Sequence, residues 1–385
     1  MATASTVANG LEGVPVAETV LSYVDGAHGR LVIAGRNVEE LSNESFEEVA
    51  ARLWAFGDDP PALAEVQRAL GTARREAHGV LDSLGGALDA PDAMDALRAS
   101  VAHLAERSSE GTPRWAGAAH VTGAVAVLAA AWARRRAGLP PIEPDAHLGH
   151  AADYLRLLRG HPAAPHEIAA LDAYLVTVVD HGLNASTFAA RVVASTGSDL
   201  VSAVTAAIGA LKGPLHGGAP GPVLDMLDAI SSPSEARTWL RHEIDARRRI
   251  MGMGHRVYRV RDPRAAVLEA AVERVRKVVA ESTTGGADRV ARRLELARAV
   301  EREATSLLAA RYPNRALRAN VEFYTAVLLE AIGVPRELFS ATFAAARTVG
   351  WAAHVDEQRR KGRLIRPSSI YTGSMPGGEE QSQSA

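Results

Sequence analysis

From Ser45 onward, almost the whole chain has apolar residues at helical spacing. The stretch "SFEEVAARLWAF" begins with a serine suited to capping a helix and places its apolar residues on one face. The stretches "HEIAALDAYLVTVVDHG", "SDLVSAVTAAIGALKGP" and "NVEFYTAVLLEAIGVP" repeat the pattern, and a glycine follows each apolar run. Glycine commonly ends a helix because it adopts the left-handed C-terminal cap. The pattern predicts a mainly α protein.

The remaining stretches predict two more helices and a little sheet. "DPRAAVLEAAVERVRKVVA" has Asp262 as its cap and Pro263 in its first turn, and "RELFSATFAAARTVGWAAHVDEQRR" predicts the last long helix. Before Ser45, "LSYVDGAHGRLVIAG" has β-favouring runs around glycine-containing turns, which predicts a short N-terminal β-hairpin. The polar, glycine-containing tail after about Gly373 predicts disorder.

Composition narrows the class of protein. The chain has 385 residues, enough for two domains, and its 47% apolar and 23% charged residues are ordinary for a soluble globular protein. A net charge of −2 gives no overall attraction to nucleic acid, and the absence of cysteine excludes disulfides and thiolate catalysis. We expect no apolar run long enough to span a bilayer and no secretory signal, hence a cytoplasmic protein.

Two glycine-rich breaks between helices each present a histidine. They are "GPLHGGAPG", with His216, and "GMGHRVYRVRDPR", with His255, while His181 follows a third break. The chain has 13 histidines, so chance placement is the alternative to function. No pair has the spacing of an H-E-x-x-H zinc site, so we expect no metal. A histidine beside glycine approaches a ligand closely and lies near free backbone N–H groups.

For several arginines, a role in binding an anionic ligand must be weighed against a plain surface position. Arg259, Arg261, Arg264 and Arg366 are each as readily explained by a solvated surface as by an anionic ligand. Arg347 differs because "TFAAARTVGW" predicts a buried helix, and a buried arginine needs an anionic partner.

Glu322 lies at the start of the apolar helix "NVEFYTAVLLEA". One interpretation is a cap or a partner of the helix dipole. The other is a carboxyl whose pKa is raised by apolar surroundings and suits it to proton transfer.

Together these stretches resemble the citrate synthase family. "DHGLNASTFAARVVASTGSDLVSAVTAAIGALKGPLHGGAPGPV" and "MGMGHRVYRVRDPRA" are similar to its two signatures, and "NVEFYTAVLLEAIGVPRELFSATFAAARTVGWAAHVDEQ" with "RLIRPSSIYTG" to its C-terminal part. "HAADYLRLLRG" fits as well, so the likeness runs from about Ser45 to Gly373. It implies an all-α, citrate synthase-like fold with a large helical domain (1–217 and 332–385) interrupted by a small helical domain (218–331).

The resemblance also implies residue roles. His216 would hold the thioester carbonyl of acetyl-CoA, His255 would polarise the oxaloacetate carbonyl, and Glu322 would be the base. The implied oxaloacetate contacts are His181, His255, Arg264, Arg347, Arg366 and Phe343. The implied CoA contacts are Met251, Gly252, Met253, Gly254 and Arg259. Arg366, in "IRPSS", would reach the partner's site in a homodimer, and no cofactor beyond the substrates is implied.

The implied reaction joins acetyl-CoA to oxaloacetate and hydrolyses citryl-CoA to citrate and CoA. A 2-methylcitrate synthase, which uses propionyl-CoA, shares every motif named above. A non-catalytic acyl-CoA or dicarboxylate-binding relative is a third hypothesis, because Glu322 replaces the aspartate of the family's "NVDF" and "LVIAGRNVEEL" departs from "YRGYDIEEL". The extra methylene of glutamate moves the carboxylate by roughly an ångström, enough to cost about a hundredfold in rate. The chain lacks the N-terminal extension of hexameric, NADH-inhibited members, which favours a dimer without that regulation.

Overall fold

The computed structural model describes residues 9–11, 13–55, 60–106, 113–217, 220–281 and 287–374. The predicted disordered tail falls mainly at 375–385, outside the described residues. The predicted start of the small domain at residue 218 lies outside them as well.

A short antiparallel sheet precedes the helices. Its strands, in the order β1-β2-β3, are β1 (Ser22–Asp25), β2 (Arg30–Ile33) and β3 (Arg36–Asn37). Ser22 pairs with Ile33 and Asp25 with Arg30, and Gly29 takes a φ of +65° in the turn between them. The predicted hairpin is confirmed, and β3 adds a third strand that the sequence pattern did not indicate.

Helices make up the remaining regular secondary structure of the described residues, as the apolar spacing predicts. In the first half they are α1 (Val38–Leu41), α2 (Phe46–Ala55), α3 (Leu63–Gly79), α4 (Ala93–Val101), α5 (Arg114–Arg136), α6 (His150–Arg159), α7 (Pro165–Val178), α8 (Ala185–Ser195) and α9 (Leu200–Leu211). In the second half they are α10 (Pro220–Ala229), α11 (Ala236–Asp245), α12 (Pro263–Ala280), α13 (Ala287–Arg311), α14 (Val321–Ala331) and α15 (Phe339–Lys361). Short 3₁₀ turns are η1 (Asn9–Leu11), η2 (Leu81–Asp89) and η3 (Arg336–Leu338).

The predicted helix caps are present. Ser45 Oγ accepts from the Glu48 N–H, and the Glu48 carboxylate accepts from the Ser45 N–H, which is a reciprocal capping box before α2. Asp262 caps α12 by accepting from the Arg264 N–H at 3.0 Å. The last long helix begins at Phe339 rather than Arg336, because η3 forms a tighter turn first.

Helix α5 corrects one expectation. By length and composition alone it is long and apolar enough to cross a membrane, contrary to the predicted absence of such a run. However, 83% of its most apolar stretch is buried inside the protein, where α5 packs against α3, α4, α6 and α15. A core helix covered on all sides is apolar around its whole circumference. Helix α5 therefore forms the centre of the larger group of helices.

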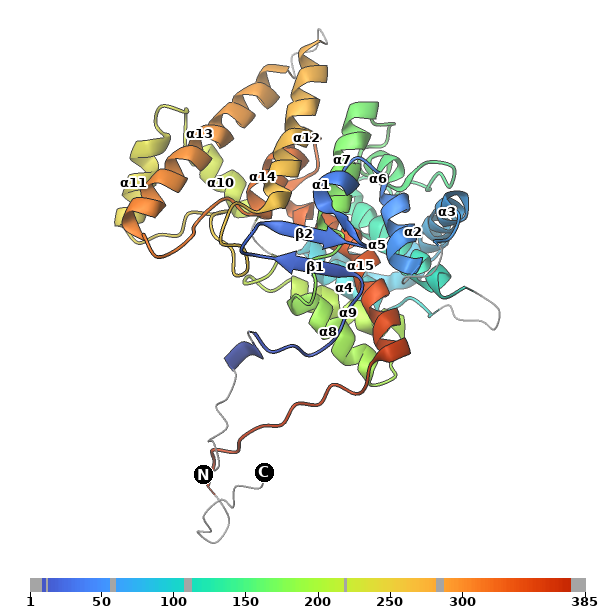
Figure 1. Ribbon diagram of the computed structural model, residues 1–385. Helices are drawn as coiled ribbons and strands as arrows, with labels where there is room; N and C mark the ends of the chain where they lie inside the picture. The colour runs from blue at the N-terminus through green and yellow to red at the C-terminus, as the bar shows by residue number, and fades with distance from the viewer. Residues whose placement is uncertain are drawn as a thin grey trace.

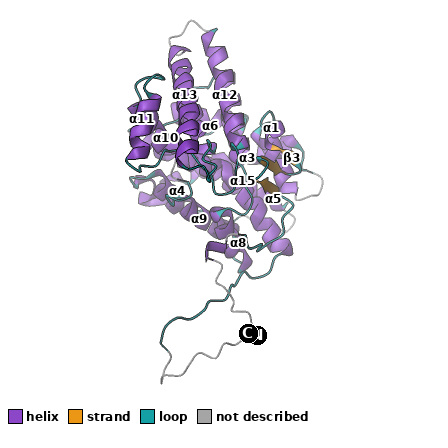
Figure 2. Ribbon diagram, turned by 60° about the vertical axis from the view of Figure 1, so that its left-hand side comes forward, coloured by secondary structure: helices purple, strands orange, loops and turns teal. Residues whose placement is uncertain are grey.

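The helices form two groups (Figure 1). Helices α11, α12 and α13 extend away from the group that contains α5 and α15, and Figure 2 shows the same separation after rotation. These helices belong to the segment that we assign to the small domain, whose boundaries remain a prediction. Residues 362–374 form no helix or strand and lead away from the helices in both views.

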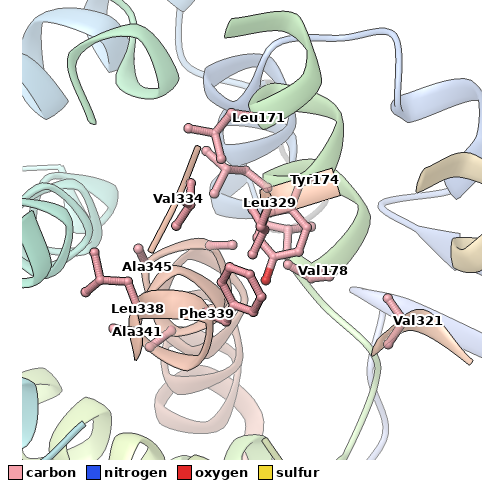
Figure 3. Packing of buried hydrophobic residues seen from close by; sticks show 14 of the residues in the cluster. Leu171, Tyr174, Val178, Val321, Leu329, Val334, Leu338, Phe339, Ala341 and Ala345 are labelled. Atoms are coloured by element: carbon pink, nitrogen blue, oxygen red, sulfur yellow. The ribbon is translucent and has the colours of Figure 1, made fainter. Parts of the chain in front are cut away.

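Helices α7, α14 and α15 meet in the buried core. Leu171 and Tyr174 of α7, Leu329 of α14 and Phe339 of α15 belong to one hydrophobic cluster (Figure 3). Farther along α15, Gly350 packs on the backbone that follows α7. A Cβ atom there would lie 2.9 Å from Asp180 Oδ1 and closer still to the Val179 carbonyl oxygen. Only glycine lets α15 approach the 179–180 segment this closely.

We predict that Gly350→Ala lowers stability by about 1–3 kcal/mol, the range for overpacking a core. Gly209→Ala in α9 is the matched control, because its Cβ would meet only Arg98 Cδ at 3.9 Å. Alanine in a helix interior normally gains about 1 kcal/mol over glycine, so the control should be neutral or stabilising. Thermal unfolding checks both variants. A melting temperature of Gly350→Ala at or above that of the unmodified protein would contradict the packing argument.

Candidate active site

One face of α15 organises the site. Arg347 Nε donates to the Val178 carbonyl at 2.6 Å, and Trp351 Nε1 donates to Ser186 Oγ at 3.1 Å. His354 Nε2 lies 3.2 Å from Asp180 Oδ1. Because residues three, four and seven positions apart share a helix face, α15 contacts the 178–186 segment along its length. This segment includes His181, and its last residue contacts His216.

His216 is held by Ser186. The Ser186 backbone N–H donates to His216 Nε2 at 3.2 Å, and Ser186 Oγ lies 2.8 Å from the same nitrogen. A backbone N–H only donates, so Nε2 accepts and the ring proton sits on Nδ1. Burial, together with Arg347 and Arg256, lowers the pKa of His216 to about 4. At neutral pH His216 is therefore an uncharged ring with Nδ1–H available as a donor.

His255 has the opposite tautomer. Its Nδ1 accepts from the backbone N–H groups of Val257 and Tyr258 at 3.0 and 3.1 Å. These are the shorter contacts of the ring, so Nδ1 is the acceptor and the ring proton sits on Nε2. The longer 3.4 Å contact of Nε2 with an Arg264 nitrogen, itself a donor, is therefore not a hydrogen bond in this tautomer. Burial, followed by the Arg264 charge, lowers the pKa of His255 to about 4. His255 is thus a second neutral donor, placed beside a cation.

His181 completes an aromatic group with His255 and Tyr258. Its ring centre lies 5.5 Å from that of His255, and its Nε2 lies 3.2 Å from the Tyr258 hydroxyl. Burial first, and then the charge of Arg264, hold the pKa of His181 well below its usual value. The structure therefore brings His181 and His255 together, although 74 positions separate them in the chain.

Two buried arginines of the site, Arg264 and Arg347, differ in their partners. Arg264 is paired with Asp262, through Nε at 3.0 Å and a terminal nitrogen at 2.8 Å. Arg347 has no carboxylate within ion-pair distance among the described residues, and its only hydrogen bond there is to Val178. The guanidinium of Arg347 lies 4.7 Å from the centre of the Phe343 ring. Burial lowers its pKa to about 10, which leaves it charged at neutral pH. Arg347 is a buried cation without a local anion.

Glu322 is positioned by the cap of α14. Asn320 Oδ1 accepts from the Glu322 N–H at 3.1 Å, while Asn320 Nδ2 donates to the Gly254 carbonyl at 3.0 Å. The Asn320 N–H donates to the Gly252 carbonyl at 3.0 Å. Burial raises the pKa of Glu322 to about 7, against the opposing charge of Arg249. The start of α14 is thus tied to the loop that contains Met251, Gly252, Met253 and Gly254.

A cavity of about 530 Å³ adjoins residues 259–261. It is lined by Arg259, Val260, Arg261, Arg298, Glu301, Arg302, Thr305 and Arg318. Arg261 and Arg298 are paired with glutamates, whereas Arg259 and Arg318 have no carboxylate partner among the described residues. The cavity therefore offers positive charge to an anion.

Arg366 is not part of this constellation within one chain. It is exposed and has no hydrogen bond or ion pair in the described part of the chain. The segment before it is anchored, since Gln358 Nε2 donates to the Arg363 carbonyl and the Ile365 N–H donates to Ser195 Oγ.

Sequence reasoning missed three contacting residues. Tyr258 lies in the glycine-rich stretch that contains His255, and Ser186 follows His181 in "DHGLNAS", so both polar residues could have been noticed from their place beside a candidate histidine. Trp351 carried no such signal, because its contact joins positions 165 residues apart.

A family description, citrate synthase C-terminal domain, matches residues 10–368. The chain belongs to the citrate synthase family. It is 38% identical to a citrate synthase of Haloferax volcanii over 381 residues, covering 94% of this chain and 95% of that protein. It is 48% identical to a putative citrate synthase 2 of Mycobacterium tuberculosis over 225 residues, which span 58% of this chain and only 56% of that relative.

Solved structures of the family agree with the fold. Citrate synthase from Thermotoga maritima matches with a TM-score of 0.80 at 34% identity, covering 98% of each chain. Citrate synthase from Thermoplasma acidophilum, in a ternary complex with carboxymethyl coenzyme A and oxaloacetate, matches with a TM-score of 0.84 at 27% identity, also covering 98% of each chain. The all-α, citrate synthase-like fold and the family resemblance are confirmed.

The raised pKa of Glu322 predicts a pH-dependent stability. Between pH 4.5, the ordinary pKa of a glutamate, and about 7, Glu322 keeps its proton in the folded protein but has lost it in the unfolded chain. This stabilisation is complete below about pH 4.5 and is lost as the pH rises through 7. Glu322→Gln cannot ionise, so its stability relative to the unmodified protein should increase from about pH 5 to pH 8. Urea unfolding across this range is the measurement. Glu65→Gln, at an exposed position, is the control, and a flat difference for Glu322→Gln would contradict the raised pKa.

Proposed function

We propose that this protein is a citrate synthase that condenses acetyl-CoA with oxaloacetate and hydrolyses the resulting citryl-CoA. The observation that carries the proposal is Arg347, a buried cation without a carboxylate partner among the described residues, in one site with two neutral histidines of opposite tautomer. A dicarboxylate substrate supplies the missing anion. The Thermoplasma relative was solved with oxaloacetate and a CoA analogue, which supports this choice of substrates.

Oxaloacetate would bind with one carboxylate on Arg347 and the other near the free edge of Arg264. His181 would contact the substrate from the same side, and Phe343 would line the pocket. His255 Nε2–H would donate to the ketone oxygen, which makes the ketone carbon more electrophilic. Because His255 is neutral, it polarises the ketone without surrendering its proton at this stage.

Enolisation of acetyl-CoA would be shared by Glu322 and His216. Glu322 takes a proton from the thioester methyl group, while His216 Nδ1–H donates to the thioester oxygen as negative charge develops there. The raised pKa makes the Glu322 carboxylate a stronger base than an exposed one. The enolate carbon then attacks the ketone carbon of oxaloacetate, and the ketone oxygen takes the Nε2 proton of His255 as its C=O π bond breaks. Water adds to the thioester carbonyl and CoA leaves as the thiol, which gives a carboxylate, while the proton held by Glu322 returns to His255 through solvent.

CoA recognition would involve the backbone of residues 251–254, with Arg259 near the phosphates. The arginine-lined cavity beside Arg259 supports the placement of phosphate charge there. Asn320 ties this loop to Glu322, so CoA binding and base placement would depend on one another. Closure of the small domain (218–331) over the large one would exclude water until condensation is complete.

We also propose a homodimer in which Arg366 reaches the partner's site. Residues 363 and 365 are fixed to their own chain just before Arg366, and the segment then continues away from the helices (Figure 1). This segment also exposes the apolar side chains of Leu364, Ile370 and Tyr371, which a second chain would bury in a dimer.

The test of the function is CoA thiol release from acetyl-CoA and from propionyl-CoA in the presence of oxaloacetate. We expect release from both and a higher kcat/KM with acetyl-CoA. One methylene in an apolar pocket is worth about 10- to 200-fold, so the ratio decides between a citrate synthase and a 2-methylcitrate synthase. Oxaloacetate binding without thiol release from either thioester would instead identify a non-catalytic relative.

Glu322→Gln should reduce kcat by at least about a hundredfold while oxaloacetate binding stays nearly unchanged, because glutamine keeps the size and loses the basicity. Glu322→Asp separates two cases: slower turnover indicates a pocket adapted to glutamate, and faster turnover indicates one that is not. Exchange of the thioester methyl protons with solvent measures the proton transfer directly. Substantial exchange in the Gln variant would show that another residue is the base.

A further inference from the structure

Asp180, directly before His181, is fully buried, and each of its carboxylate oxygens has a close polar neighbour. Its Oδ2 accepts from the Ser22 hydroxyl and, at 3.3 Å, from the Gly182 N–H. Its Oδ1 lies 3.2 Å from His354 Nε2. Three separate elements, β1, the 180–182 segment and α15, therefore restrain this one carboxylate.

The tautomer of His354 follows from its other neighbour. Arg191 Nη1 lies 2.9 Å from His354 Nδ1, and a guanidinium group only donates. Nδ1 therefore accepts, and the ring proton sits on Nε2, toward Asp180. The Nε2–Oδ1 contact is electrostatic and lacks hydrogen-bond geometry, and neither atom has a hydrogen-bond partner among the described residues. Arg191 is itself fixed by Glu357 at 2.5 Å and by Gln358 at 3.0 Å.

Arg347 lies on the same face of α15, two turns before His354. The Asp180 charge acts on Arg347, yet the two side chains are beyond ion-pair distance. Both are buried, so their attraction is only weakly screened. This attraction favours an arrangement in which a freed Asp180 carboxylate competes with a substrate carboxylate for Arg347.

We infer that His354 and Ser22 are positioning residues that hold Asp180 away from Arg347 and so keep Arg347 open to a substrate carboxylate. The inference rests on the proposed role of Arg347 in oxaloacetate binding. In this arrangement Asp180 offsets the charge of the buried arginine from a distance without blocking it. No local pattern indicates this role, because His354 and Asp180 are 174 positions apart in the chain.

The experiment compares oxaloacetate affinity, by calorimetry on the full-length protein, for His354→Leu and His354→Gln. Leucine fills similar space to histidine but has no N–H donor, so Asp180 would be free to turn toward Arg347. The Kd for oxaloacetate should then rise roughly 10- to 100-fold, which is the range for losing a hydrogen bond to a charged group. Glutamine keeps an N–H donor toward Asp180 and should stay closer to the unmodified protein. In both variants KM for oxaloacetate should change more than kcat.

The double variant His354→Leu with Asp180→Asn separates positioning from packing. The asparagine side chain has no charge with which to capture Arg347, so the double variant should bind oxaloacetate more tightly than His354→Leu alone. Weaker binding in the double variant, or an unchanged Kd in His354→Leu, would overturn the inference.

If His354→Leu does not fold, Ser22→Ala makes the same test by removing one half-buried hydroxyl from Asp180. Its expected rise in Kd is about 2- to 10-fold, and an unchanged Kd would again overturn the inference. Failure of the unmodified protein to bind oxaloacetate would overturn the proposed function and this inference with it. Normal binding by the unmodified protein and an equal Kd in the variants would overturn the inference alone.

Discussion

The molecule depends on keeping one arginine charged, buried and unpaired. Burying a cation costs several kcal/mol unless nearby charges and dipoles offset it. Around Arg347 the offset is partial: one backbone carbonyl, the face of Phe343 and the more distant Asp180. The guanidinium of Arg347 loses its water when the protein folds. An anion that binds to it therefore does not have to offset the desolvation of the arginine a second time. By the same logic, a dicarboxylate that binds only the folded protein would stabilise it by mass action.

The histidine chemistry is set mainly by backbone groups. The proton of His216 is assigned by the Ser186 N–H, and that of His255 by two consecutive N–H groups in its own loop. Backbone donors are fixed by the fold and do not ionise, so both tautomers persist over a wide pH range. The low pKa values of about 4 serve the same end, because neither ring gains a charge near neutrality. Two donors of fixed direction are what a condensation between two carbonyl compounds requires.

The sequence predicted those parts of the fold that depend on local patterns. The apolar face of α7, the Ser45 and Asp262 caps and the hairpin are all encoded within a few residues. Helix α5 was not recognised as a long apolar helix, because a helix buried all round lacks the polar face that sets the period. At the site, the glycine-flanked histidines and the arginine in an apolar helix could be predicted as candidates from the sequence. Ser186, Asp180 and His354 were not, since their roles arise only where α15 packs on a distant segment.

The contact between Gly252 and Phe323 restricts how this site evolves. Gly252 has a φ of +72°, and a Cβ there would lie 2.8 Å from Phe323 Cδ2 and 3.1 Å from Phe323 Cα. A smaller residue at position 323 would remove the first obstacle but not the second, which is backbone. No single compensating substitution restores freedom at position 252. Any residue with a Cβ at position 252 therefore requires the backbone at Phe323 to shift, and with it the start of α14, where Glu322 lies.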